Sequence, residues 1–522
     1  AEVWKKLLPG IDDPVPLDES FFDLGGHSIL ATRLVFQLRQ KLGVHVPLGL
    51  VFDAPTIAQL AAATEKISSG GTDFLVAAPD TAKENALSGD LDYAKDAQVL
   101  ESELPASFMR ATPAGEPRVV LLTGATGFLG AYVLADLLDK RRNLVQKVYV
   151  HVRANDAGSA QRRLRDALAG RGLWREAWEQ EGRVQAVVGD LSKPHLGLND
   201  ADWAHLAKEV HVIVHNGALV HWVYPYSKLR AANVLSTMAV MRLANEGRPK
   251  SVAFVSSTSA LDTEYYIRFS DTSAQGVLES DSLDGSASDL KSGYGQSKWV
   301  AERLLMAAAS RGLAAVIIRP GYVVGDSKTA VTNTDDFLFR LIKGSAQLGL
   351  IPDMNNTINM VPVDHVARVT SLAGLAAIQW PENHQTHAAV FHVTSHPTIR
   401  YNEFLGALIE YGWNVRPVEY LEWRTALENH VLASAAAGNT GLDADSNALF
   451  PLLHFVLDDL PTSTKSPELN DANTTKLLTE AHELDVVRGV DVPLVGLYLS
   501  WLVAVGFLPP PASKSARTLP AL

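Results

Sequence analysis

The sequence predicts an α/β protein: a small helical bundle, then a doubly wound parallel sheet, then a smaller, mostly helical C-terminal subdomain. Three patterns predict this order. Residues 1–66 show apolar residues at helical spacing and no strand pattern. From Arg118, short apolar strands alternate with helical stretches, as in sheets whose strands are joined by crossover helices. After Tyr401 the strand pattern fades and helical periodicity dominates.

Length and composition are those of a multidomain globular protein. The chain has 522 residues, 47% apolar and 20% charged, and its net charge of −12 argues against a nucleic-acid partner. The absence of cysteine excludes disulfides and thiolate metal sites and fits a reducing, cytoplasmic location; no metal is expected. Residues 1–6 begin neither a signal peptide nor an initiator methionine, which predicts a fragment of a longer chain.

The helical bundle, residues 1–66, carries a candidate attachment site at Ser28. This serine begins a predicted helix directly after Asp23-Leu24-Gly25-Gly26-His27. A phosphodiester on its hydroxyl would be stabilised by the helix N-terminus, and the glycines let a modifying enzyme approach the backbone. The alternative is that Ser28 only caps the helix. Helices are predicted at Glu2–Leu8, Ser28–Leu42 and Pro55–Ala63.

Composition predicts the other boundaries. Residues 67–112 are acidic and lack sustained periodicity, so we expect a linker, either a solvated tether or a belt over the next domain. The sheet domain is expected at 113–400, the helical subdomain at 401–508, and a disordered tail at 509–522. The apolar run Val492–Leu508 predicts a buried helix capped by Asp491 rather than a membrane span, because it is short. Strands are predicted at Arg118–Thr123, Lys147–Arg153, Val184–Gly189, Val210–His215, Ser251–Ser256 and Ala315–Arg319.

A glycine-rich turn follows the first strand and opens a helix, in the run Thr123-Gly124-Ala125-Thr126-Gly127-Phe128-Leu129-Gly130. In that context Gly124 permits the tight turn and Gly127 lets a pyrophosphate approach the backbone. Gly130 lets the helix pack closely on the sheet. The turn therefore predicts a Rossmann-type dinucleotide site.

The ends of the following strands predict which dinucleotide binds. Arg153 stands where an NAD enzyme carries an acid, so we expect NADPH, with Arg163 either assisting or lying on a solvated helix face. The remaining candidates lie at later strand ends. They are Asp190 and Leu191 near the adenine, Asn216, Gly217 and Ala218 near the ribose, and Pro320 near the nicotinamide.

A catalytic set is predicted at the fifth strand and the helix after it. Reducing a carbonyl requires a proton donor and groups that stabilise the oxyanion. Tyr294 and Lys298 are four residues apart on a predicted helix, so the ammonium is expected to lower the pKa of the phenol. Thr258, just after the strand, is expected to complete the oxyanion site.

A second pair with the same spacing, Tyr224 and Lys228, also occurs. It lies beside Pro225 and precedes the fifth strand, whereas the Tyr294 pair follows that strand and begins a helix. Chain order therefore favours Tyr294.

Longer stretches carry a family resemblance. From Phe21 through Ser28 to Thr56, the first module resembles phosphopantetheine carriers, and the region from Gly124 to Lys298 resembles extended short-chain dehydrogenase/reductases. Joined, they are similar to the thioester reductase domains that end nonribosomal peptide synthetases and carboxylic acid reductases. The match to the fungal L-2-aminoadipate reductases of lysine biosynthesis is closer still, and it covers nearly all of residues 1–508. Three segments carry it: His215–Tyr226, Arg319–Asp326 and Asn359–His365.

The resemblance implies NADPH-dependent release of a carrier-bound aminoadipyl thioester as the semialdehyde. It also implies 4′-phosphopantetheine on Ser28, attached by a phosphopantetheinyl transferase, and an adenylation domain before Ala1; no membrane partner is expected. Two alternatives stay open, namely release of an aryl or peptidyl aldehyde, and a non-catalytic carrier with an inactive dinucleotide module. The intact catalytic set disfavours the second. Residues expected to line the substrate pocket, or else to be plain core, are His221, Trp222, Tyr224 and Tyr226.

Overall fold

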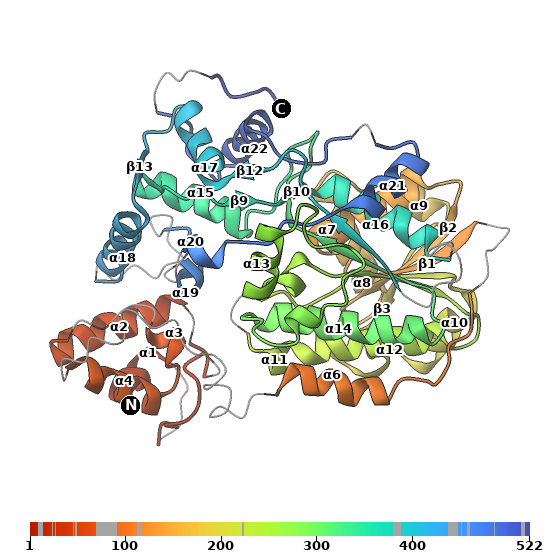
Figure 1. The fold of residues 1–522 in the computed structure, drawn as a ribbon, viewed down its shortest axis with the longest axis horizontal. Coiled ribbons are helices and arrows are strands. Elements are labelled where there is room, and N and C mark those ends of the chain that lie inside the picture. Colours follow the sequence, from red (N-terminus) through yellow and green to blue (C-terminus); the bar gives the residue numbers. More distant parts are fainter. Residues whose placement is uncertain are drawn as a thin grey trace.

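The computed structural model shows a helical bundle beside a larger α/β body, with a second helical lobe above the bundle (Figure 1). It describes residues 1–8, 14–22, 24–26, 28–44, 46, 50–68, 91–111, 117–221, 224–378, 388–436, 447–449, 452–456, 460–484, 486–512 and 517–522.

The N-terminal bundle forms around buried aromatic and aliphatic side chains. Trp4 and Phe21 meet edge to face with ring centroids 5.0 Å apart, and Leu34 and Val35 are fully buried beneath them. The three predicted helices are confirmed, and a short fourth helix was not predicted because one turn carries no periodicity. The helices are α1 (Glu2–Leu7), α2 (Ser28–Leu42), α3 (Leu50–Asp53) and α4 (Ile57–Ser68).

The α/β body is built on a parallel sheet of seven strands in the order β11-β6-β5-β4-β1-β2-β3. The first six strands confirm the prediction within two residues at each end. The seventh strand, β11, was missed. It pairs with β6, from which it is separated in the sequence by more than 60 residues. Their bounds are β1 (Arg118–Thr123), β2 (Val145–Val152), β3 (Val184–Val188), β4 (Val212–His215), β5 (Ser251–Val255), β6 (Ala315–Pro320) and β11 (Ala389–Val393).

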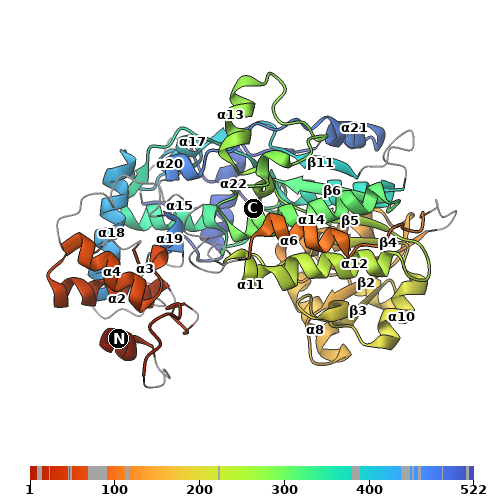
Figure 2. The same ribbon diagram turned by 60° about the horizontal axis from the view of Figure 1, so that its bottom comes forward.

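Helices cover both faces of this sheet, because alternate strand residues point to opposite sides. Val119 and Leu121 join one buried cluster, while Val120 and Leu122 join the other. Figure 2 shows most of the first of these layers in front of the sheet. That layer contains α6 (Tyr93–Ser102), α10 (Asp200–Glu209), α11 (Tyr226–Arg230), η4 (Ala231–Leu235), α12 (Ser236–Ala244), η5 (Thr258–Leu261), α13 (Glu264–Thr272) and α14 (Gly293–Ser310). The opposite layer contains α7 (Phe128–Ala135), η2 (Asp136–Lys140), α8 (Ala157–Ala169), α9 (Glu176–Gln180), α16 (Val363–Ala376) and α21 (Ala472–Glu480).

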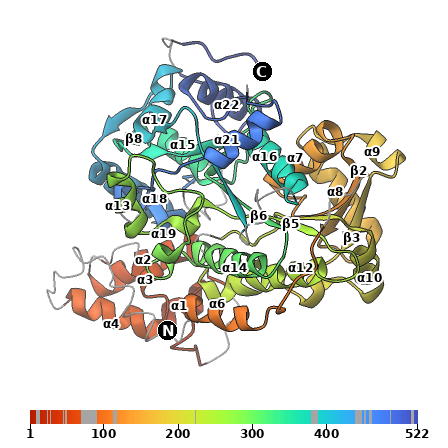
Figure 3. The ribbon, with the colours of Figure 1, turned by 45° about the vertical axis from the view of Figure 1, so that its right-hand side comes forward.

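The C-terminal subdomain does not begin at residue 401 as expected. Phe337, Leu341 and Met360 belong to its buried cluster, whereas Leu477 and Leu478 pack back on the sheet (Figure 3). Segments before residue 401 thus belong to the subdomain, and a later segment belongs to the sheet domain. Composition did not predict this because both lobes are built from the same apolar residues. The subdomain elements are β7 (Tyr322–Val324), α15 (Phe337–Leu348), β8 (Leu350–Pro352), β9 (Thr357–Ile358), β10 (Met360–Pro362), β12 (Ile399–Arg400), α17 (Tyr401–Glu410), β13 (Arg416–Val418), α18 (Tyr420–Ala436), α19 (Leu453–Val456), α20 (Leu460–Ser463) and α22 (Val492–Ala504); short turns η3 (Pro194–Gly197) and η6 (Asp284–Ser286) lie in the sheet domain.

The second half of the predicted linker is a belt held on the sheet domain. Helix α6 buries Asp96, whose carboxylate accepts hydrogen bonds from Arg230 Nε (2.7 Å) and from the Tyr226 hydroxyl. Tyr93 packs edge to face on Trp299 of α14, with centroids 5.3 Å apart. A solvated tether therefore does not describe residues 91–111.

The chain end also differs from the prediction. Arg517 Nε pairs with Glu410 at 2.8 Å, and Ser500 Oγ donates to the carbonyl of Pro520 at 2.8 Å. These contacts order the described part of the expected disordered tail. Helix α22 is confirmed as a buried helix, with the Asp491 side chain accepting from the Leu494 amide. None of the helices in the described ranges is long and apolar enough to cross a membrane.

Candidate active site

The glycine-rich turn leaves no room for side chains. Gly124 has a φ of +76°, and a Cβ there would lie 2.6 Å from the Cα of Gly217. A Cβ on Gly130 would lie 2.1 Å from the carbonyl oxygen of Gly124, so the helix α7 packs directly on the turn. Exposed Gly127 is the N-cap of α7, and no side chain caps that helix. The arrangement fits a pyrophosphate bound at the helix N-terminus.

Strand β4 closes the other side of this turn. The Gly217 amide donates to Thr123 Oγ1 at 2.8 Å, and Asn216 Nδ2 lies 3.4 Å from the carbonyl of Gly124. A Cβ on Gly217 would lie 2.8 Å from the side chain of Leu191. The predicted cofactor residues on β1, β3 and β4 are therefore neighbours. Thr126, Phe128, Leu129 and Ala218 are partly exposed in the same turns.

The end of β2 is basic, as expected for a 2′-phosphate site. Arg153 is exposed just after the strand, and Arg163 Nη1 donates to its carbonyl oxygen at 2.7 Å. Although desolvation opposes it, hydrogen bonds from Ser192 and the charge of Arg153 lower the pKa of Asp190. Arg153, Arg163 and Asp190 therefore lie at one edge of the sheet, where they would hold the adenosine end of NADPH.

The predicted catalytic residues meet where β5 ends and α14 begins. Lys298 is buried, and its Nζ donates to the carbonyl of Val255 at 2.8 Å while lying 5.7 Å from the centre of the Tyr294 ring. Thr258 begins the turn η5, which packs on α14 so tightly that a Cβ on Gly295 would lie 2.7 Å from the carbonyl of Ser259. Thr258, Tyr294 and Lys298 are thus held by adjacent, tightly packed elements.

The expected lowering of the Tyr294 pKa is wrong. Burial raises the pKa of Tyr294 above its usual range, and desolvation also lowers the pKa of Lys298 to about 8, with the charge of Glu302 opposing. The ammonium is committed to Val255 and does not compensate for the desolvation of a phenolate. The phenol therefore stays protonated, which suits a proton donor.

A buried ion pair next to the catalytic lysine escaped the sequence analysis. Arg319 Nη2 and Glu302 Oε2 are 2.7 Å apart with both side chains fully buried, and Glu302 also accepts from Ser256 Oγ. Arg319 Nη1 lies 3.0 Å from His392 Nε2. Glu302 lies one helical turn after Lys298, so this pair ties α14 to strands β5, β6 and β11. A Glu four residues after the lysine was its only sequence signal.

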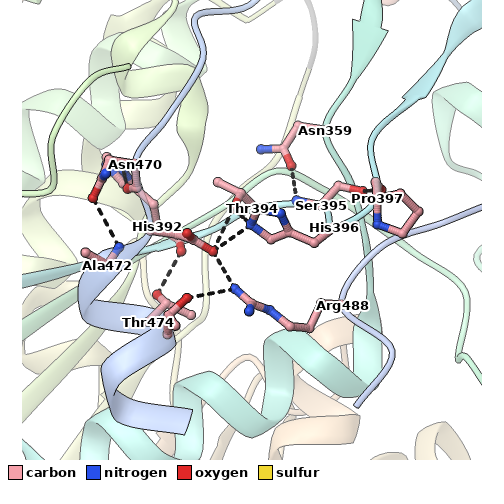
Figure 4. A network of polar contacts seen from close by, with 12 residues as sticks. Asn359, His392, Thr394, Ser395, His396, Pro397, Asn470, Ala472, Thr474 and Arg488 are labelled. Atoms are coloured by element: carbon pink, nitrogen blue, oxygen red, sulfur yellow. Dashed lines mark hydrogen bonds and ion pairs between the residues drawn. The ribbon is translucent and has the colours of Figure 1, made fainter. Parts of the chain in front are cut away.

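Beyond His392 the network reaches α21 (Figure 4). His392 Nδ1 lies 2.7 Å from the carbonyl of Asn470, and Thr474 Oγ1 donates to the His392 carbonyl at 2.7 Å. Just past β11, His396 Nε2 lies 2.8 Å from Asp471, which Arg488 also contacts. These contacts fix the ends of β6 and β11 beside Pro320.

Asn233 is a second residue that the sequence did not reveal. From η4, its Nδ2 donates to the carbonyl of Leu219 (3.0 Å) and to Ser297 Oγ (3.0 Å), while its Oδ1 accepts from the Leu219 amide (2.7 Å). It therefore joins the loop after β4 to the helix that carries Tyr294.

The expected substrate-lining residues separate into two groups. His221 and Tyr224 stack with ring centroids 3.6 Å apart, in the loop that packs against the start of α14. Tyr226 is buried and donates its hydroxyl to Asp96 on the belt helix, so it takes the alternative place expected for it, in the core. Trp222 lies outside the described residues.

The carrier site is described by its backbone. Helix α2 begins at Ser28, as predicted. Gly25 has a φ of +93°, and a Cβ on Gly26 would lie 2.4 Å from the Phe21 ring, so both glycines are required by the turn before the helix. Asp23 and His27 lie outside the described residues.

Comparisons with known proteins place both modules. Residues 1–64 match the family model described as phosphopantetheine attachment site, and residues 122–370 match the model described as male sterility protein. The carrier's prosthetic group is thus 4′-phosphopantetheine, and the reductase module uses NADPH.

Similar full-length proteins extend beyond this chain. The L-2-aminoadipate reductase of Schizosaccharomyces pombe is 46% identical over 527 residues, covering 99% of this chain and 35% of the relative. That of Saccharomyces cerevisiae is 46% identical over 540 residues, covering 100% of this chain and 37% of the relative. The chain therefore spans a little over a third of the curated relatives it matches.

Similarity to a solved structure establishes the family of this chain. The terminal R domain of the myxalamid PKS-NRPS pathway superimposes with a TM-score of 0.67 and 31% identity, covering 81% of this chain and all of that one. A thiolation-reductase di-domain of an archaeal non-ribosomal peptide synthetase shares the fold, with a TM-score of 0.66 and 20% identity over 97% of this chain and 96% of that one. The chain belongs to the family of reductase domains that includes this myxalamid R domain, and it is similar to the L-2-aminoadipate reductases over nearly its whole length.

Proposed function

We propose that this chain reduces an L-2-aminoadipyl thioester, tethered to phosphopantetheine on Ser28, and releases L-2-aminoadipate 6-semialdehyde. The observation that carries the reaction type is the set of Thr258, Tyr294 and Lys298 at the sheet edge that also holds the dinucleotide turn. The assignment of the acyl group rests on the 46% identity to two fungal L-2-aminoadipate reductases over almost the whole chain.

Each residue has a definite task in this reaction. Bound NADPH supplies the hydride for the thioester carbonyl carbon. Tyr294, whose phenol stays protonated, donates a proton to the oxygen as it gains negative charge, and the Thr258 hydroxyl stabilises that oxygen. The resulting hemithioacetal breaks its C–S bond, so that its hydroxyl becomes the aldehyde carbonyl and the sulfur leaves as the carrier thiol. Lys298 supplies positive charge beside the phenol.

The partners follow from this division of labour. A phosphopantetheinyl transferase modifies Ser28, and an adenylation domain forms the thioester, because hydride does not add readily to an anionic, resonance-stabilised carboxylate. We therefore expect no turnover from free aminoadipate, ATP and NADPH with this chain alone.

Single turnover of a preloaded carrier tests the proposal. A transferase would load Ser28 from aminoadipyl-coenzyme A, and NADPH oxidation and the aldehyde would be followed together. Equal amounts of NADP⁺ and semialdehyde are expected. Failure to reduce the loaded chain would refute the proposed function, and faster reduction of an aryl or peptidyl group would replace the acyl assignment.

A further inference from the structure

A row of polar side chains crosses the sheet face that α14 covers. Ser256 follows β5, Arg319 lies in β6 and His392 lies in β11. Arg319 and His392 are register partners in the paired strands. The Ser256 amide donates to the carbonyl of Ile318, the residue before Arg319, at 2.7 Å. The three polar residues therefore lie side by side on neighbouring strands, at the carboxyl ends where a dinucleotide binds in such sheets.

Glu302 of α14 contacts two members of this row. Its carboxylate accepts from Arg319 Nε at 2.9 Å and from Arg319 Nη2 at 2.7 Å, and it also accepts from the Ser256 hydroxyl. His392 Nε2 lies 3.0 Å from Arg319 Nη1, and His392 Nδ1 lies 2.7 Å from the carbonyl of Asn470. Glu302, Arg319 and His392 are fully buried. A pair of opposite charges is therefore enclosed between α14 and the sheet.

Lys298 is attached to the same end of β5 as Glu302. The two residues are four apart on α14, so their side chains leave the helix on one face. Lys298 Nζ donates to the carbonyl of Val255 at 2.8 Å, and the hydroxyl of the next residue, Ser256, donates to Glu302. The ammonium and the ion pair are thus anchored to consecutive residues of the chain. Whatever fixes Ser256 also fixes the carbonyl that holds Lys298.

The charges around Lys298 decide whether it remains an ammonium. Desolvation lowers the pKa of Lys298 to about 8, and the charge of Glu302 opposes that change. His215 of β4 also faces this lysine, but it is neutral because burial lowers its pKa to about 3. Tyr294 keeps its proton because burial raises its pKa. Glu302 is therefore the acid that supports the ammonium, and Arg319 offsets the charge of that acid.

We propose that Glu302 is a positioning residue for thioester reduction: it holds the end of β5 that seats Lys298, and it balances Arg319 so that the neighbouring ammonium keeps its charge. The inference rests on the reductive step of the proposed function and not on its acyl group. A buried ion pair is a weak source of stability, because the desolvation of two charges offsets most of their attraction. Stability therefore explains this pair less well than its place beside Lys298 does.

A purely structural role for Glu302 makes a different prediction. If the pair only held α14 on the sheet, loss of either charge would lower the rate equally at every pH. Charge balance instead predicts that loss of the acid and loss of the cation shift the pH profile in opposite directions. The direction of the shift therefore separates the two roles.

The experiment measures kcat/KM against pH for a free small-molecule thioester with saturating NADPH, in the full chain and in three variants. Glu302→Gln keeps an acceptor for the Ser256 hydroxyl but leaves Arg319 uncompensated, so the fall in kcat/KM should move to lower pH by about one unit. Arg319→Met leaves Glu302 as an unbalanced acid, so the fall should move to higher pH by about as much. The double variant lacks both charges, and its profile should return close to that of the unchanged chain.

Asp96→Asn is the matched control, because Asp96 is also a buried carboxylate that accepts from an arginine, Arg230 Nε at 2.7 Å, on a helix packed against α14. It should lower the midpoint of thermal unfolding without moving the pH profile. If Glu302→Gln does not fold, the comparison of Arg319→Met with the double variant gives the answer. Unchanged profiles, or shifts of the same sign, would overturn the inference while thioester reduction still stands. An unchanged chain that reduces no thioester would overturn the proposed function and the inference with it.

Discussion

At the scale of single residues, Tyr294 is defined by burial rather than by its lysine. Its phenol is desolvated, and Lys298 hydrogen-bonds to Val255 instead of to the phenol. Tyr294→Phe should therefore lower the rate of carbonyl reduction by about 10²- to 10⁴-fold, the usual contribution of general acid catalysis, while NADPH affinity changes little.

The matched control for Tyr294 is Tyr224→Phe. Tyr224 belongs to the second tyrosine–lysine pair, but it lies in the loop after β4 and stacks on His221. Tyr224→Phe should therefore lower the single-turnover rate far less than Tyr294→Phe does. The assignment of the proton donor would be wrong if the Tyr224 variant were the slower of the two.

Lys298 predicts how the rate depends on pH. Desolvation lowers the pKa of Lys298 to about 8, whereas the pKa of Tyr294 is raised. As pH rises past about 8, Lys298 therefore loses its charge before the phenol ionises, and kcat/KM should fall. Lys298→Arg should move this fall to higher pH, because a guanidinium keeps its charge. An unchanged profile in that variant would assign the fall to another group.

Arg153 predicts the choice of cofactor. It is exposed at the end of β2, with Arg163 bonded to its carbonyl, where a 2′-phosphate would lie. Arg153→Ala should weaken NADPH binding by about 1.5–3 kcal/mol, the value of a charged hydrogen bond, and NADH binding much less. Titration by fluorescence measures both affinities. Equal losses for the two cofactors would contradict the assignment.

At the scale of secondary-structure elements, α6 is part of the reductase fold. Asp96 of this helix is buried and bonded to Arg230 and Tyr226. Asp96→Ala would leave both donors without an acceptor and should lower the free energy of unfolding by about 1–3 kcal/mol. The midpoint of thermal unfolding measures this loss. Glu103→Ala, at the exposed end of the same helix, should change it little, and equal midpoints for the two variants would show that the belt is only loosely held.

The sequence predicted an element well wherever its structure depends on residues close to it in the chain. The turn at Gly124 and the helix at Tyr294 depend on neighbours within a few residues, and both are as predicted. Contacts between distant segments left little trace in the sequence. The missed strand β11 and the pair of Arg319 with Glu302 join residues far apart in the chain. The wrong pKa direction for Tyr294 has the same origin, since burial is decided by the whole fold.

At the scale of the whole molecule, the carrier rests on the C-terminal subdomain. Helix α2 lies against α18, and Arg39 Nη2 meets Glu428 Oε1 at 2.8 Å with both side chains mostly buried (Figure 1). The buried cluster of the carrier is continuous with that of the subdomain. A carrier held in this way keeps its acyl group at a high effective concentration near the reductase, without any increase in the affinity for the acyl group itself.

The Arg39–Glu428 contact predicts a defect confined to the tethered substrate. Glu428→Arg places two positive charges together and should slow reduction of the loaded carrier on the order of tenfold, because a partly buried charged hydrogen bond is replaced by repulsion. Reduction of a free small-molecule thioester should not change. Adding Arg39→Glu should restore part of the rate, since Arg39 also donates to the Val46 carbonyl, which a glutamate cannot replace. Glu422→Arg is the matched control, because Glu422 lies on the same helix but pairs with Arg416 of its own subdomain. If Glu428→Arg slowed the free and the tethered substrates equally, the contact would be a structural support of the subdomain and not a docking site of the carrier.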